Sequence, residues 1–163
     1  MSKYDVKNIA NYVINYFYEN SDKLKNNEEN FEILEINNLK MQKVLYFLYG
    51  FFYSETREEL FDVEFLAWKL GPVIKSIYEI NKNATENNGY RNIPKDTYCE
   101  FAKKIEDEDK KLINQILDNL MEISTWALVE LSHKPGGPWE ATKQSEVISR
   151  DLLNKYFRNL ELK

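Results

Sequence analysis

The sequence predicts a mainly α-helical fold, a single domain of about five to seven helices. Hydrophobic residues recur every three or four positions in most of the 163-residue chain. Five glycines and four prolines interrupt this periodic pattern, and two polar stretches, 20–35 and 81–97, separate the periodic segments. With 43% hydrophobic and 30% charged residues, the composition is that of a globular protein with a sizeable core. The pattern leaves room for a short β-hairpin between the central helices.

The first predicted helix covers Val6–Glu19, with Asp5 as its N-cap. One face follows the helical period and consists of Ile9, Val13, Tyr16 and Phe17. The polar stretch that follows predicts a surface connection.

The second predicted helix covers Leu39–Ser54, and either Asn37 or Asn38 can cap it. Hydrophobic residues occupy most of its circumference, which is typical of a central helix. Gly50 costs such a helix about 1 kcal/mol relative to alanine. It therefore indicates either a close approach by another backbone or a helix end.

Alternating apolar and polar residues over Phe61–Phe65 predict a short strand or extended arm. Gly71 suits a turn, and Pro72 suits the first position of a helix that continues to about Asn81. The arm is the obvious partner for Arg91–Tyr98, and the Asn-Asn-Gly sequence just before that segment could close a small hairpin.

The C-terminal half predicts three further helices. The first begins at Asp107 or Asp109, the second covers Trp126–Ser132 after a cap at Ser124 or Thr125, and the last follows a cap at Ser145 and reaches Leu160. The acidic run Glu106–Asp109 fits a helix N-terminus, where carboxylates complement the helix dipole.

The net charge of −5 argues against broad nucleic-acid binding, which needs a basic face. We interpret the two lysine pairs, Lys40 with Lys43 and Lys69 with Lys75, as solvated surface residues. The single Cys99 cannot form an internal disulfide, which favours a reducing cytoplasm. No apolar run is long enough for a membrane helix, and the N-terminus lacks a signal-peptide pattern.

Catalytic and metal chemistry find little support. With one histidine and one cysteine, a metal site would depend on carboxylates, and none has calcium-loop spacing. Ser132 and His133 are neighbours, which does not point their side chains at each other in a helix. Cys99 and His133 are far apart in the sequence and could come into contact only if the fold brought them together. Carboxylate pairs such as Asp62 and Glu64, or Glu130 and Glu140, arise by chance among 27 acidic residues. We therefore predict no enzyme, cofactor or metal.

The most unusual segment is Leu131–Trp139, which holds the only histidine, two glycines, two prolines and a tryptophan. Such residues predict a sharply shaped turn. His133 fits the C-terminus of the preceding helix. We expect Trp139, and Trp68 in the similar Ala67–Val73 turn, to anchor the two turns side by side against the core.

Three segments resemble motifs of one family. Residues 38–47 (NLKMQKVLYF), 65–73 (FLAWKLGPV) and 131–139 (LSHKPGGPW) are similar in order and spacing to the signature segments of the SocA-like antitoxins, or Panacea domain. The start of the first helix, 8–12, fits as well. The sequence departs from the usual pattern at Leu66 and Leu70, where the family more often has a charged and an aromatic residue.

The resemblance implies that residues 1–163 form one Panacea domain, mainly α-helical and often phage- or mobile-element-associated. Such a protein neutralises a cognate toxin by direct binding, and some members deliver the toxin to a protease. The residues that match the motifs, and that we assign to binding the partner or shaping the site, are Trp68, Gly71, Pro72, His133, Pro138 and Trp139.

Other functions stay open at this stage. They are a regulator or proteolytic adaptor that acts on a host or defence protein, a nucleic-acid-associated regulator, and a hydrolase that uses Cys99 or Ser132 with His133. The many tyrosines suit a half-solvated recognition surface, and an acidic domain could complement a basic toxin.

Overall fold

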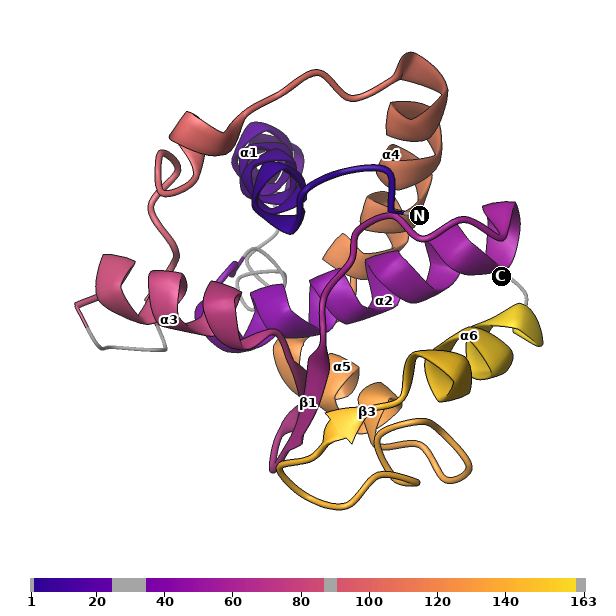
Figure 1. Ribbon diagram of the computed structural model, residues 1–163. Helices are drawn as coiled ribbons and strands as arrows, with labels where there is room; N and C mark the ends of the chain where they lie inside the picture. The colour runs from indigo at the N-terminus through magenta and orange to yellow at the C-terminus, as the bar shows by residue number, and fades with distance from the viewer. Residues whose placement is uncertain (1, 25–34, 87–90, 161–163) are drawn as a thin grey trace.

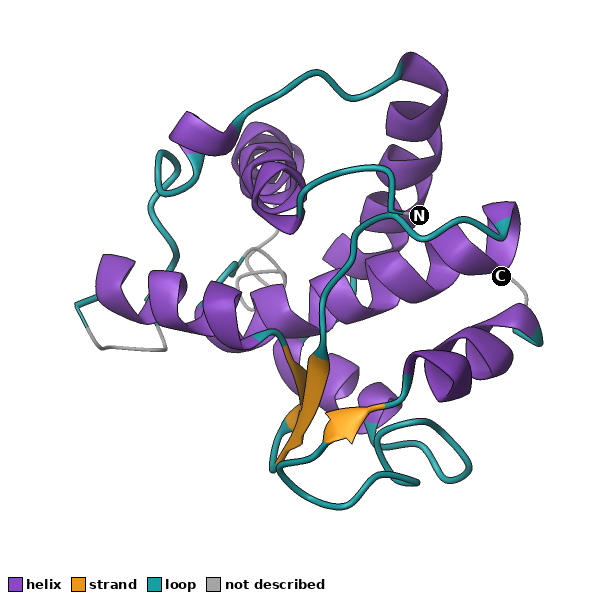
Figure 2. Cartoon of the chain, in the orientation of Figure 1, coloured by secondary structure: helices purple, strands orange, loops and turns teal. Residues whose placement is uncertain are grey.

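A computed structural model describes residues 2–24, 35–86 and 91–160, and these contain six α-helices and a small antiparallel sheet (Figures 1 and 2). The helices are α1 Val6–Leu24, α2 Asn38–Thr56, α3 Lys75–Ala84, α4 Asp107–Met121, α5 Thr125–Ser132 and α6 Arg150–Arg158, with a short 3₁₀ helix, η2, at Cys99–Phe101. The mainly α-helical prediction is confirmed. None of the helices in these ranges has the length and apolarity to cross a membrane.

Helix α2 is the centre of the molecule, as its sequence predicts. It packs against α3, α4, α5, α6 and β2 (Figure 1), and most of its residues are buried. Asn37 is the cap, because its side chain accepts a hydrogen bond from the Lys40 N–H at 2.9 Å. Helix α2 continues past Gly50, and a Cβ there would lie 2.2 Å from the Phe157 ring of α6. The close approach is therefore real, but an aromatic ring makes it rather than another backbone.

The sheet consists of β1 Phe65–Trp68, β2 Gly71–Val73 and β3 Val147–Ile148, in the order β2-β1-β3. The predicted β-hairpin between central helices is confirmed, but it is formed by β1 and β2, which we call the hairpin. The prediction that Phe61–Phe65 pairs with Arg91–Tyr98 was wrong, because β1 pairs with β2 on one side and with β3 on the other. Periodicity cannot reveal a strand contributed from about 80 residues away.

Two turn assignments also change. Pro72 does not start a helix: it lies in the edge strand β2, where its missing N–H costs no ladder bond, and α3 begins at Lys75. Ser145 does not cap the last helix, because α6 begins only at Arg150. The Ser145 backbone N–H instead donates to Ala67 O at 2.7 Å. Ser149 takes the capping role by accepting from the Leu152 N–H. Ser124, one of the two predicted candidates, caps α5.

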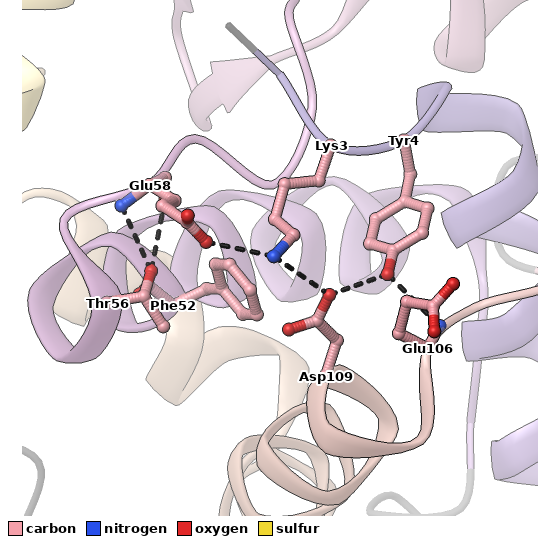
Figure 3. A network of polar contacts seen from close by, with 7 residues as sticks. All are labelled: Lys3, Tyr4, Phe52, Thr56, Glu58, Glu106 and Asp109. Atoms are coloured by element: carbon pink, nitrogen blue, oxygen red, sulfur yellow. Dashed lines mark hydrogen bonds and ion pairs between the residues drawn. The ribbon is translucent and has the colours of Figure 1, made fainter.

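The N-terminal segment ties the end of α2 to the start of α4 (Figure 3). The backbone N–H groups of Lys3 and Tyr4 donate to carbonyls of residues 59 and 60. The Lys3 ammonium lies 2.9 Å from Glu58 and 3.2 Å from Asp109 (Figure 3). The Tyr4 hydroxyl donates to Asp109 at 2.6 Å and accepts from the Glu106 N–H. These contacts fasten the first residues across two helices, which the sequence did not predict.

Candidate partner-binding site

The two motif turns meet at the hairpin. The Trp139 indole N–H donates to Trp68 O at 2.7 Å and so joins segments that are 71 residues apart. Trp68 in turn packs edge-on against Tyr78 of α3, with the ring centres 4.9 Å apart. The expectation that the two turns lie side by side is therefore confirmed.

His133 occupies the end of α5, as predicted, and braces the turn. Its ring stacks on Trp139 with the ring centres 3.7 Å apart, and it hydrogen-bonds to the Leu70 backbone. Desolvation, together with the Lys43 ammonium, lowers the pKa of His133 below its usual 6.5 against the effect of the Leu70 bond. Its Nε2 atom is buried and has no hydrogen-bond partner in the described part of the chain. A neutral His133 imidazole packed between Trp139 and the Leu70 backbone suits a structural role.

Gly71 and Pro72 are buried in β2 rather than displayed on the surface. Gly71 has φ +114°, and a Cβ there would lie 2.6 Å from both Lys43 Cε and Ser132 Oγ. Only glycine suits this backbone conformation and this space. Pro72 accepts a hydrogen bond from Lys43 Nζ at 2.9 Å. The second motif is thus clamped between α2 and α5.

The interpretation of Lys40 and Lys43 as solvated was wrong, because both side chains are completely buried. Desolvation lowers the pKa of Lys43 to about 7 and that of Lys40 to about 8. Lys43 reaches Pro72 O, while the Lys40 ammonium lies 5.4 Å from the centre of the Phe17 ring. Lys69 and Lys75 are exposed, as expected.

A buried amide network continues the first motif. Gln42 Oε1 accepts from the Ile74 N–H at 2.8 Å and so holds the end of β2. Asn38 Oδ1 accepts from Gln42 and from Asn81 of α3, while the Asn38 amide donates to Tyr78 O. The polar residues of the first motif therefore fix α3 and the hairpin onto α2.

A groove of about 420 Å³ opens beside the hairpin, and we call it the hairpin groove. It lies between α2, α3, α5 and the hairpin, and its lining residues are Asn38, Leu39, Gln42, Trp68, Lys69, Leu70, Val73, Tyr78, Lys82 and Trp126. Trp126 is 56% exposed and Leu70 is 40% exposed, which is unusual for side chains this apolar. Pro138, by contrast, is buried in the Trp139 turn.

The candidate catalytic groups are engaged elsewhere or lie apart. The Ser132 hydroxyl donates to Val129 O at 2.7 Å. Cys99 is exposed in η2, and no hydrogen bond joins it to His133 in the described ranges. Asp62 pairs with Arg150, and Glu140 accepts from the Gly136 N–H. Among the described residues no group of three or more His, Cys, Asp or Glu side chains could hold a metal ion.

Comparison with known proteins matches residues 41–140 to the family model described as "Antitoxin SocA-like, Panacea domain". The match covers more than half of the chain. This chain belongs to the SocA-like Panacea family. Antitoxin SocA of Caulobacter vibrioides is 33% identical to this Panacea protein over 112 residues, 66% of this chain and 60% of the relative's length. No solved structure matches significantly.

The matched segment of the Panacea domain contains the whole hairpin and the Trp139 turn, together with most of the groove lining. Sequence reasoning missed the groove residues Trp126, Tyr78 and Lys82. A signal for Trp126 existed: Leu128, Val129 and Ser132 share the buried face of α5 with Thr125, and Trp126 lies off that face.

Proposed function

We propose that this protein is a cytoplasmic antitoxin that neutralises a cognate toxin by binding it directly, with residues 1–163 acting as one non-catalytic binding module. The observation that carries the proposal is the hairpin groove, which is lined by residues of the first two motifs and exposes Leu70 and Trp126. The third motif contacts the same hairpin through the bond from Trp139 to Trp68 O. Exposed tryptophan and leucine beside a rigid frame are typical of a protein-binding site. The Caulobacter relative is itself named an antitoxin, which supports the same role here.

The motif residues support binding rather than catalysis. Lys43, His133 and Trp139 all contact the hairpin, and their polar atoms bond to protein backbone or are buried. A framework of this kind holds an interface in a fixed shape and limits the entropy lost on binding. A stable complex with a folded toxin buries roughly 800 Å² of surface on each partner, so the groove would be the centre of a larger interface.

Co-expression with the proteins encoded by neighbouring genes tests the proposal. We expect one of them to be toxic alone, tolerated with this chain, and recovered with it as a stable complex on size-exclusion chromatography. Absence of both protection and complex formation would contradict the proposal.

Stoichiometry separates binding from catalysis. A binding antitoxin should silence the purified toxin in proportion to the amount added, up to an equivalence point. Complete silencing far below equimolar amounts would show turnover and would refute the non-catalytic mechanism.

A further inference from the structure

The hairpin groove differs in charge from the molecule around it. The chain carries a net charge of −5, yet two lysines, Lys69 and Lys82, line the groove, and none of its lining residues in the described part of the chain is a carboxylate. Both lysines are exposed. A ligand with negative charge would therefore be attracted to this part of an otherwise acidic protein.

The polar groups of the lining are unequally satisfied. The two amide oxygens are already used: Gln42 Oε1 takes the Ile74 N–H, and Asn38 Oδ1 takes two amide donors. The indole N–H groups of Trp68 and Trp126 have no acceptor among the described residues, and the ammonium groups of Lys69 and Lys82 add further donors. A well-matched ligand must bring acceptors together with apolar surface.

The dimensions of the groove suit a short segment rather than a domain. A volume of about 420 Å³ lies in the roughly 300–1,000 Å³ range of pockets that enclose small ligands. It therefore admits a few side chains. Leu39, Leu70 and Trp126 would contact them from three sides of the groove.

We infer that the hairpin groove binds a short segment of the toxin in which one or two large apolar side chains are flanked by carboxylates. The inference rests on the proposed function. The apolar side chains fill the groove and displace water from Leu70 and Trp126, while the carboxylates face Lys69 and Lys82. A nucleic-acid strand also offers acceptors, but it requires a longer basic track than two lysines provide.

Calorimetric titration of the purified toxin with variants of the full chain tests the site. Trp126→Ala removes an exposed anchor, and we expect at least about tenfold weaker binding. The double charge reversal Lys69→Glu with Lys82→Glu should weaken binding about fivefold or more, and the loss should shrink at high salt. Matched controls are Val147→Ala, which trims an exposed apolar residue in β3, and Lys111→Glu with Lys155→Glu on exposed helix surfaces. Both should bind like the wild type.

The chemistry of the ligand is tested with overlapping peptides that cover the toxin sequence. The peptides that bind should contain an aromatic or leucine side chain flanked by aspartate or glutamate, and amide substitution of the carboxylates should abolish binding. Binding only by basic peptides, or competition by a single-stranded oligonucleotide, would overturn the inference.

The outcomes separate the two proposals. If the wild-type chain protects and binds but Trp126→Ala and the lysine reversals keep full affinity, the groove is not the site, while the antitoxin function stands. If the wild-type chain neither protects nor binds, the proposed function fails and the inference fails with it.

Discussion

Replacing Gly50 with alanine should destabilise the protein, although alanine is the better helix former. Helix propensity alone would favour Gly50→Ala by about 1 kcal/mol. The new Cβ, however, would lie 2.2–2.4 Å from three atoms of the Phe157 ring, whereas carbon atoms prefer about 3.5–4.0 Å. The ring must move by more than 1 Å in a fully buried site. Overpacking of this kind costs about 1–3 kcal/mol. Because the ring is fully buried and must move by more than 1 Å, we expect a cost in the upper part of this range, about 2–3 kcal/mol, which leaves a net loss of about 1–2 kcal/mol after the gain in helix propensity.

A double-mutant cycle with Phe157→Ala identifies the cause. Without the ring the clash disappears, so Gly50→Ala should become neutral or stabilising in that background. Urea unfolding followed by circular dichroism measures each free energy. Gly136→Ala is the control, because Gly136 has open space around it and a φ of +82°, so its cost should be the same in both backgrounds. A Gly50→Ala variant that is as stable as the wild type, or equally destabilised without Phe157, would refute the argument.

Three further predictions concern polar contacts. The pKa of Lys43 is about 7 in the folded protein and 10.5 in the unfolded chain, so the unfolded chain binds more protons between these values. Lys43 should therefore contribute a rise in stability of about 1 kcal/mol per pH unit from pH 7 to 9.5. Lys43→Met should reduce this slope in urea titrations, and an unchanged slope would contradict burial. Trp139→Phe keeps an aromatic ring but removes the donor to Trp68 O, so we expect the free energy of unfolding to fall by about 1–2 kcal/mol, which lowers the Tm. An unchanged Tm would show that this bond does not hold the hairpin. Asp109→Asn removes the charge that faces Lys3 and should cost about 1 kcal/mol at low salt and less at high salt, and a salt-independent loss would exclude the ion pair as its cause.

Local pattern was sufficient for the helices of the described residues and for some of their caps. The period of apolar residues located all six, and Asn37 and Ser124 were among the predicted caps, because a helix and its cap interact within a few residues of each other. The motifs also indicated the two turns, since glycine and proline restrict the backbone whatever surrounds them. The position of the sheet did not follow, because β3 pairs with β1 from about 80 residues away.

The sequence by itself determined the helical framework, the family and the two shaped turns of this protein. Only the tertiary structure decided which of the remaining residues are buried and which form the site. Lys43 is polar by composition, yet it is buried because the fold brings Pro72 O within 2.9 Å of its ammonium. Trp126 is apolar, yet it stays exposed at the groove because Leu128 and Val129 already occupy the buried face of α5. Burial depends on contacts between distant segments, and these are absent from any local window of sequence.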